Sequence, residues 1–380
     1  MQCAIGKGGA MALVPGTKPM PRGPRSAAGP RRSRVQVPVR CQAVATAVQA
    51  PAAPYVQQQA VQAPVAPSPP ATLACELIQG NLARYSDASK GGGAPTAVLV
   101  HGILGSRRNL AGLARMIVEG FPAWQVLLVD LRCHGDSAAA AGGDAAPGPH
   151  SVDSAARDVL ELLRSRRMFP QMLIGHSFGG KVVMSMARQF GGGSTRLPRP
   201  VQVWVLDALP GEARAGGGPG GGGDHPGQLI AALQALPMPV AARADLIDML
   251  TARGFSLPIA RWMTTNLRPA DGPGGGLTWS FDLGGIADMY ASYESSDLWS
   301  LLSAPPQGLK VDFVRATRST FRWEGGAEEG IAALGHRVHA LDAGHWVHTD
   351  NPGGLFDILA PTFGATDLHM QHAARSSGVR

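Results

Sequence analysis

Residues 171–188 read Gln-Met-Leu-Ile-Gly-His-Ser-Phe-Gly-Gly-Lys-Val-Val-Met-Ser-Met-Ala-Arg, and this stretch decides the fold. A short apolar run leads into a G-x-S-x-G pattern, and a helical pattern follows it. A strand, a tight turn and a helix in this order form a nucleophile elbow, where the serine is strained and small residues must flank it. The stretch therefore predicts Ser177 as a nucleophile. It also places the Phe178 amide at the positive end of a helix, where it can stabilise an oxyanion.

Short apolar runs alternate with helical patterns on both sides of this elbow. Runs of four to eight apolar residues bounded by turn signals are typical of strands buried on both faces, and their alternation with helices predicts an α/β fold with a mostly parallel sheet. Residues near 72–87 are expected to add an antiparallel edge. The predicted strands are 94–101, 124–131, 171–175, 201–206, 309–314 and 337–341, and the helices between them include 151–168, 178–190 and 352–363.

Residues 208–306 break this alternation, because they contain no pattern for a central strand. We interpret them as a helical lid over the carboxyl ends of the strands, with helices near 227–236, 241–253, 256–267 and 284–302. Two glycine tracts, 216–223 and 272–276, are expected to be flexible loops. The apolar residues of this lid form either an acyl pocket or the lid's own core. They are Leu229, Leu233, Leu236, Met238, Leu246, Met249, Leu250, Leu257, Trp262, Met263 and Trp279.

Two further loops follow predicted strands near the elbow. His101-Gly102-Ile103-Leu104-Gly105-Ser106 ends the first main strand, and its turn can point the Ile103 amide at the oxyanion, opposite the Phe178 amide. We assign His101 a structural role in that turn. The motif that starts at Asp130 and includes His134 precedes the serine in the chain, whereas the order expected for this fold is Ser, acid, His. It is therefore interpreted as a structural network.

The histidine that would act as general base follows the last predicted strand. Ala343-Gly344-His345-Trp346-Val347-His348 places His345 where it can take the Ser177 proton and return it to the leaving group. His348 is the alternative, although it lies closer to the helix start at Asp350 and is expected to order that turn.

The carboxylate that would orient His345 has three candidates. In the fold that these motifs resemble, the loop after the penultimate strand usually supplies this acid, but here that loop contains no acid before Glu324. Asp207 stands directly at the end of the preceding strand, which makes it the preferred candidate. Glu324 and the lid residue Asp282 remain alternatives.

The four motifs HGILGS, DLRCHGDS, GHSFGGK and AGHWVHTDNP occur in order between about Ala94 and Phe363. Together they resemble the α/β-hydrolase superfamily, particularly its esterase- and thioesterase-like branch with plastid-type plant and algal members. The resemblance implies a serine hydrolase that acts on a carboxylic ester or thioester, with no metal or organic cofactor. A lyase and a non-catalytic small-molecule receptor are the alternatives on the same scaffold. Epoxide hydrolases and dehalogenases are disfavoured, because those relatives carry an aspartate where Ser177 stands.

Charge distribution argues against a nucleic-acid partner. The chain of 380 residues has 34 basic and 27 acidic residues, but eight of the basic residues precede Glu76, the first acid. Without those eight, 26 basic residues face 27 acidic ones, so the basicity belongs to the leader and not to the body. No apolar stretch is long enough to span a membrane. The four cysteines form no C-x-x-C pair, which argues against a zinc finger.

The leader has the composition of an organelle transit peptide, since it is rich in Arg, Ala, Val and Ser and lacks acids. Six prolines between residues 15 and 38 would break an amphipathic helix, which favours the plastid over the mitochondrion. We expect a transit peptide over 1–45 and an uncharged Ala/Pro/Gln linker over 46–71. The hydrolase-like domain is then expected over 72–365, followed by a tail over 366–380.

Overall fold

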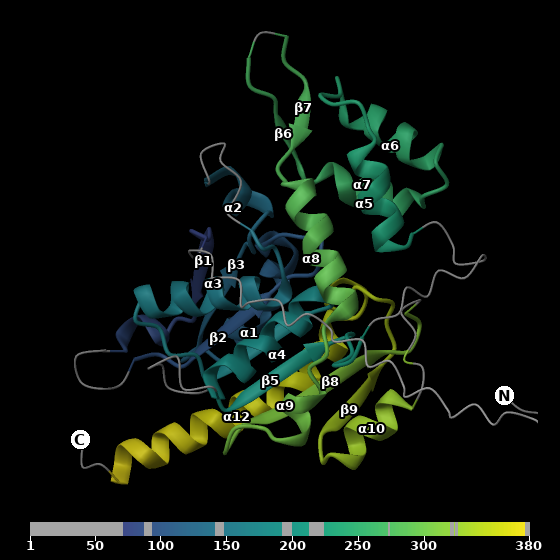
Figure 1. Ribbon diagram of the computed structural model, residues 1–380. Coiled ribbons are helices and arrows are strands. Elements are labelled where there is room, and N and C mark those ends of the chain that lie inside the picture. The colour runs from purple at the N-terminus through teal and green to yellow at the C-terminus, as the bar shows by residue number, and fades with distance from the viewer. Residues whose placement is uncertain are drawn as a thin grey trace, which may run out of the picture. The chain divides into compact units, whose positions relative to one another are not determined.

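The central sheet of the computed structural model has seven strands in the order β1-β3-β2-β4-β5-β8-β9 (Figure 1). Strand β1 pairs antiparallel with β3, and every other pairing in this sheet is parallel. This confirms the predicted mostly parallel sheet with an antiparallel edge. The strands are β1 (Cys75–Gln79), β2 (Thr96–Val100), β3 (Gln125–Val129), β4 (Met172–His176), β5 (Gln202–Leu206), β8 (Lys310–Ala316) and β9 (Arg337–Leu341).

The structure describes residues 71–86, 93–140, 148–191, 200–212, 224–272, 274–319, 323 and 326–376. The predicted transit peptide, nearly all of the predicted linker, the glycine tract 216–223 and Glu324 lie outside these residues, so the corresponding predictions stay predictions. Within the described part of the chain, no helix is both long and apolar enough to cross a membrane.

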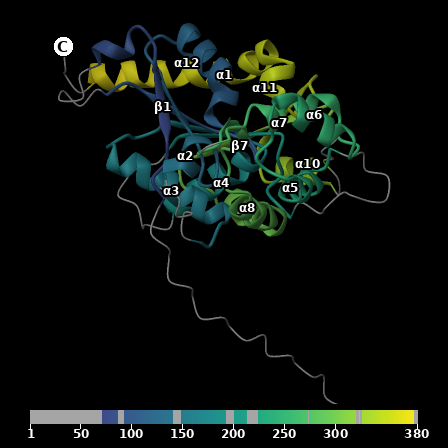
Figure 2. The same cartoon turned by 90° about the horizontal axis from the view of Figure 1, so that it is seen from above.

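Helices cover both faces of the sheet, and Figure 2 shows the two layers on opposite sides of it. Helices α1 (Ala111–Gly120) and α12 (Pro352–Ser376) lie on one face, and α3 (Val152–Ser165) and α4 (Phe178–Gly191) lie on the other. The strand period of two explains the double core. On β2, for example, Ala97 and Leu99 belong to the apolar cluster that contains Phe363 of α12, whereas Val98 and Val100 belong to the cluster that contains Val182 of α4.

The topological switch point of the sheet lies between the neighbouring strands β2 and β4. The chain continues from β2 to β3 on one side and from β4 to β5 on the other. The loops that leave the carboxyl ends of β2 and β4 therefore diverge onto opposite faces. Open α/β sheets bind their ligands in the crevice at such a switch point. The HGILGS loop follows β2 and the elbow follows β4, so both lie at this point.

The lid is helical, as predicted, and it also contains a small sheet that the sequence patterns missed. Strands β6 (Leu267–Pro269) and β7 (Leu277–Trp279) pair antiparallel around the tract 272–276. Three residues are too few to show a strand period, and Gly272, Gly274, Gly275 and Gly276 all have positive φ, which allows the reversal. The lid helices are α5 (Pro226–Gln234), α6 (Arg243–Thr251), α7 (Leu257–Thr264), α8 (Leu283–Ser295) and α9 (Trp299–Ser303).

Hydrogen bonds connect the lid to loops at the carboxyl edge of the sheet. Asn266 donates from Nδ2 to the Leu104 carbonyl over 3.2 Å, and the Asp282 amide donates to the Cys133 carbonyl over 2.9 Å. Leu104 follows β2 and Cys133 follows β3. The insertion therefore lies over the strand ends from which the predicted site residues project.

The C-terminal helix is longer than predicted. We expected it to end near Phe363 and a tail to follow over 366–380, but α12 runs to Ser376. Residues 367–375 are mostly Leu, Met, Gln, Ala, His and Arg, and several of these are strong helix formers. The other short helices are α2 (Gly135–Ala140), α10 (Ala327–Ala333) and α11 (Val347–Asp350), together with 3₁₀ turns at Ala83–Tyr85 and Arg107–Leu110.

Candidate active site

Ser177 stands between the end of β4 and the start of α4, in the geometry that the elbow motif predicts. Its φ of 53° lies in the left-handed region, which is strained for a residue with a side chain. Its amide donates to the Leu206 carbonyl over 2.8 Å, and its own carbonyl accepts from the Gly180 amide over 2.8 Å. These bonds hold the strained turn at the edge of the sheet. The residue is only 9% exposed.

The two outer glycines of the motif are required by close backbone approaches. A Cβ at Gly175 would collide with the Gly179 carbonyl, and a Cβ at Gly179 would collide with the carbonyl of Val100 on β2. Only residues without a side chain let the turn close this tightly. The same packing brings the start of α4 against the loop that follows β2.

The structure brings Asp207 and His345 together. Asp207 follows β5 and His345 follows β9, and His345 Nδ1 lies 2.7 Å from Asp207 Oδ2. Asp207 is fully buried and its φ is 49°, while its amide donates to the Val314 carbonyl over 2.8 Å. Parallel pairing of β4 with β5 sets His176 opposite Leu206, so Ser177 and Asp207 leave neighbouring strands at the same level.

Two further donors hold the Asp207 carboxylate. Its Oδ1 accepts from the Ala316 amide over 3.1 Å and from Trp323 Nε1 over 3.2 Å. Sequence reasoning had not identified Trp323, because nothing in its local pattern points to a residue on another strand. Of the two alternative acids, Glu324 lies outside the described residues. Asp282 instead caps α8, where its Oδ1 accepts from the Gly285 amide over 3.1 Å.

A cluster of three histidines surrounds this pair. His176 donates from Nε2 to the His345 carbonyl over 2.7 Å, and its ring lies 4.9 Å from that of His345 and 4.8 Å from that of His348. Burial lowers the pKa of His176 well below its ordinary value, and burial followed by the charge of His345 lowers the pKa of His348 to about 4. Asp207 thus pairs with His345, the preferred general base, whereas the ring of the alternative base, His348, packs against His176.

His101 and His134 connect the loops around the elbow. His101 donates from Nδ1 to the Gly102 carbonyl and accepts at Nε2 from the Leu131 amide, over 2.8 and 3.0 Å. His134 accepts at Nε2 from the Leu104 amide over 3.1 Å, and burial lowers its pKa to about 3. Both rings are therefore neutral hydrogen-bonding elements, which agrees with their predicted structural role.

The Asp130 carboxylate also connects loops around the elbow through hydrogen bonds. It accepts from the Arg107 amide over 2.6 Å, from the Arg107 guanidinium and from the Asp136 amide over 3.0 Å. It thus joins the loop after β2 to the loop after β3, as the structural interpretation of this motif predicted.

The two predicted oxyanion donors lie on either side of Ser177. Phe178 begins α4 and is almost completely buried, and Ile103 follows the turn at Gly102. A Cβ at Gly102 would lie 3.4 Å from Ser177 Cβ, so this turn packs directly against the serine. The β2 loop and the helix start therefore face the same small space.

Two buried residues that the sequence analysis did not single out, Tyr293 and Lys181, connect the elbow helix to the lid. Tyr293 of α8 is 4% exposed, and its ring lies 6.0 Å from that of Phe178, the residue that follows Ser177. Burial raises the pKa of Tyr293 well above its ordinary value, so it acts only as a neutral phenol. Lys181 of α4 is fully buried beneath it, with Nζ 4.5 Å from the centre of the Tyr293 ring.

The Lys181 ammonium binds three carbonyls that belong to the lid and its entrance. Nζ donates to Tyr293 over 2.6 Å, to Gly211 over 2.7 Å and to Ser296 over 3.0 Å. Desolvation lowers the pKa of Lys181 to about 8. This one side chain therefore connects the elbow helix to the end of α8 and to the chain leaving β5.

Aromatic side chains form a wall next to His345. Trp346 lies with its ring 6.1 Å from that of His345, and Trp262 of α7 packs edge-on against Trp346 at 5.7 Å. Most of the apolar lid residues named above are buried within the lid core. Met238, Met249, Trp262 and Trp279 are half-buried, and Leu257 is exposed.

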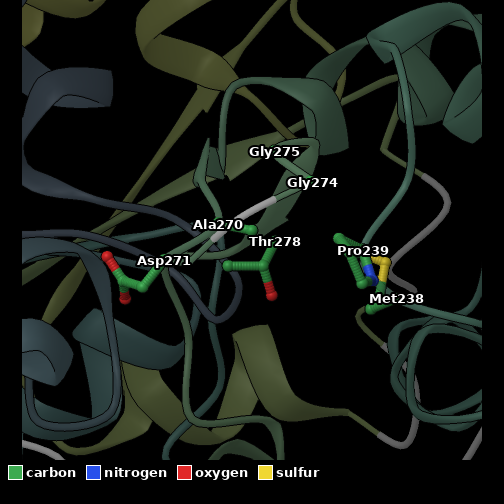
Figure 3. A pocket seen from close by; sticks show the side chains of 7 residues that line it. All are labelled: Met238, Pro239, Ala270, Asp271, Gly274, Gly275 and Thr278. Atoms are coloured by element: carbon green, nitrogen blue, oxygen red, sulfur yellow. The ribbon is translucent and has the colours of Figure 1, made fainter.

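A separate pocket of about 470 Å³ lies on the lid (Figure 3). None of its lining residues belongs to the loops that carry Ser177, Asp207 or His345, and its walls combine apolar side chains, glycines and short polar side chains. It is a feature of the lid hairpin and not of the candidate active site. It is lined by Met238, Pro239, Ala270, Asp271, Gly274, Gly275 and Thr278.

Comparison with known proteins agrees with this architecture. Residues 97–358 match the alpha/beta hydrolase family. Over 277 residues the chain is 28% identical to the mouse (Mus musculus) sn-1-specific diacylglycerol lipase ABHD11, covering 70% of this chain and 80% of that protein. A shorter match of 97 residues is 36% identical to 2-succinyl-6-hydroxy-2,4-cyclohexadiene-1-carboxylate synthase of Klebsiella pneumoniae, covering 26% of this chain and 34% of that one.

Among solved structures, a marine microorganism esterase superposes with a TM-score of 0.56. That alignment covers 77% of this chain and 99% of the esterase at 18% sequence identity, so it supports the fold alone. The family match spans most of the chain and includes all the loops described above. This protein belongs to the alpha/beta hydrolase family.

Proposed function

We propose that the protein is a serine hydrolase that cleaves a carboxylic ester or thioester through an acyl-enzyme intermediate. The observation that carries this proposal is the meeting of three loops at one sheet edge. Ser177 stands in a strained turn after β4. Asp207, which follows β5 and is fully buried, lies 2.7 Å from Nδ1 of the half-buried His345, which follows β9. Similarity to the mouse lipase supports the reaction class.

In the proposed mechanism, Asp207 determines which nitrogen of His345 is the base. Because Nδ1–H donates to Asp207, Nε2 is left to take the Ser177 proton as the hydroxyl attacks the acyl carbon. The amides of Ile103 and Phe178 stabilise the tetrahedral oxyanion, and the helix dipole of α4 adds to the Phe178 donor. His345 then protonates the leaving alcohol or thiol. Water, activated by the same histidine, releases the acid and regenerates Ser177.

We propose that the acyl group is apolar. The wall formed by Trp262 and Trp346 lies beside His345, and the rings of Phe178 and Tyr293 lie 6.0 Å apart on the elbow side. Apolar walls with a few polar groups are typical of sites that bind acyl chains. Trp262→Ala is therefore expected to raise KM for long-chain esters more than for acetyl esters.

A fluorophosphonate probe followed by a panel of acyl esters and thioesters tests the proposal. We expect the probe to label Ser177, and Ser177→Ala to abolish both labelling and turnover while the melting temperature stays close to that of the wild type. If the folded wild type were not labelled, the proposal would fail in favour of a non-catalytic small-molecule receptor.

A lyase that uses the same groups is the second candidate, because of the local similarity to the Klebsiella synthase. The two enzymes differ in a measurable way. A hydrolase consumes one water for each ester cleaved and passes through an acylated Ser177, which mass spectrometry detects after rapid acid quenching. Labelling by the probe without turnover of any ester or thioester would favour the lyase.

The cellular location remains a proposal based on composition. A fusion of residues 1–60 to a fluorescent protein is expected to enter plastids, because this segment has eight basic residues and no acid. Import into mitochondria would instead support the mitochondrion, the alternative location.

A further inference from the structure

Three side chains capable of binding a metal converge beside the lid, away from Asp207 and His345. They are Cys133 in the loop after β3, His150 in the loop before α3, and Asp282 at the start of α8. One ligand atom from each lies within 4.8 Å of the other two. The proposed hydrolysis assigns no role to any of them.

We propose that Cys133, His150 and Asp282 form a site for a divalent ion of zinc type. The donor set itself argues for this class of ion. A thiolate sulfur and an imidazole nitrogen suit Zn²⁺, whereas Mg²⁺ and Ca²⁺ prefer sites built from oxygens alone. Three protein ligands leave the fourth tetrahedral position for water or another small ligand.

The sulfur and the nitrogen are already at the spacing that a tetrahedral ion requires. Cys133 Sγ and His150 Nδ1 lie 3.4 Å apart. Bonds of about 2.3 Å to sulfur and about 2.05 Å to nitrogen at a tetrahedral angle would separate the two atoms by about 3.6 Å. These two side chains therefore need almost no rearrangement to bind the ion.

The Asp282 carboxylate both caps a helix and lies next to the other two ligands. Oδ1 accepts from the Gly285 amide and caps α8. One oxygen of this carboxylate lies within 4.8 Å of the ligand atoms of Cys133 and His150, so it reaches the cluster. Two anionic ligands would offset both the charge of the ion and the positive end of α8, which by itself would disfavour a cation.

Gly285 keeps the centre of the cluster open. A Cβ at this position would collide with Cys133 Sγ, and it would lie 3.0 Å from Asp282 Oδ2 and 3.2 Å from His150 Cδ2. All three ligand side chains thus lie close to the position that a side chain at 285 would occupy. Any other residue at 285 would fill the space that they surround.

The backbone around the three ligands is firmly held. The Asp282 amide donates to the Cys133 carbonyl over 2.9 Å, and the Val152 amide donates to Ser292 Oγ of α8 over 3.1 Å. Arg132 Nη1 donates to the Pro149 carbonyl over 3.1 Å. The ion would therefore connect two core loops to the lid helix whose Tyr293 carbonyl binds Lys181 of the elbow helix. Binding displaces one proton from the Cys133 thiol to solvent as the metal–sulfur bond forms.

Metal titration of the full-length chain tests the site. After treatment with a chelator and gel filtration, the protein is titrated with Zn²⁺ against a competing indicator dye. Replacement by Co²⁺ is followed in the near ultraviolet, where a cobalt–thiolate bond absorbs. We expect one equivalent of metal per chain, release of about one proton, and a thiolate-to-cobalt band.

Matched variants separate this site from adventitious binding. Cys133→Ser should lose the cobalt band, whereas Cys75→Ser, which changes the half-buried free cysteine on β1, should keep it. Asp282→Asn keeps a good helix cap but loses the charge, so it should weaken Zn²⁺ binding more than about tenfold, since changing even outer-shell partners costs about 10- to 100-fold. Absence of stoichiometric binding by the wild type, or a band that survives Cys133→Ser, would overturn the proposal.

Discussion

The sheet edge and the lid of this protein are built in different ways. At the edge, each key group is held by several short-range constraints. Asp207 accepts hydrogen bonds from His345, Ala316 and Trp323, and the glycines at 175 and 179 are required by contacts between backbones. On the lid, by contrast, the glycines at 272, 274 and 275 have open space around the position of a Cβ.

This difference indicates a division of labour between the two regions. A site that must hold reacting groups within a fraction of an ångström needs overdetermined loops on a rigid sheet. A cover that admits substrate needs only a few attachments, and here Asn266, Asp282 and the carbonyls bound by Lys181 provide them. Changes at the edge should therefore have large effects and changes in the exposed lid hairpin small ones, while the buried side of lid helix α8 lies between these cases.

The largest effect is expected from Asp207→Asn. The amide would leave His345 without an anionic partner and would favour the wrong tautomer, so kcat should fall by about three to four orders of magnitude. Steady-state kinetics on the best ester of the panel measures this. Glu324→Gln is the control and should change kcat less than about tenfold. The opposite ranking of the two folded variants would move the acid to the later loop.

Gly179→Ala should destabilise the sheet edge through a steric collision, without changing a catalytic group. The new Cβ would meet the Val100 carbonyl, so we expect a loss of more than about 3 kcal/mol in the free energy of unfolding. Gly284→Ala, on lid helix α8, has only an ordinary contact at 3.4 Å and should be neutral or stabilising by up to about 1 kcal/mol. Urea unfolding compares the two, and equal losses would contradict the distinction between edge and lid.

Acid should destabilise the core through its buried histidines. His134 and His348 have pKa values lowered to about 3 and about 4, whereas the unfolded chain binds these protons near pH 6.5. The unfolded state therefore holds more protons below pH 6.5, and stability falls as the pH drops, by about 2 kcal/mol for each histidine at pH 5. Urea unfolding at pH 7.5 and 5 measures the loss. His348→Asn should reduce the loss of stability between pH 7.5 and 5 by about 2 kcal/mol, the share of one histidine. An unchanged pH dependence would argue against a contribution from His348.

The smallest of these effects is expected at Tyr293 of α8, whose ring packs against Phe178 next to the nucleophile. Tyr293→Phe removes only a buried hydroxyl, whose hydrogen bonding is worth about 1 kcal/mol, so kcat/KM should fall up to about tenfold. Thr278→Val in the lid pocket is the control and should change kcat/KM less than about twofold. If Tyr293→Phe and Thr278→Val had the same kcat/KM, the Tyr293 hydroxyl would contribute no more to the reaction than a side chain of the lid pocket.

Much of this arrangement could be predicted from local sequence. The order of the core elements could be predicted from the apolar runs of the strands and the periodicity of the helices. Buried strands of a parallel sheet are recognisable because they are short continuous apolar runs. Ser177 and His345 could be chosen because each follows a recognisable strand within a few residues. The short pairing of β6 with β7 escaped detection, since three residues cannot display a period.

The strand–turn–helix at Ser177 follows from local sequence, since its geometry depends on neighbours in the chain and on glycines at fixed positions. Which carboxylate meets His345 depends on the assembled sheet, because Asp207 lies 138 residues away and reaches it through the packing order β5-β8-β9. The contacts of Lys181 with α8, 112 residues away, and the convergence of Cys133, His150 and Asp282 have the same origin. Side chains brought together by the docking of a lid leave no periodic trace along the chain, so their meeting is a property of the folded molecule.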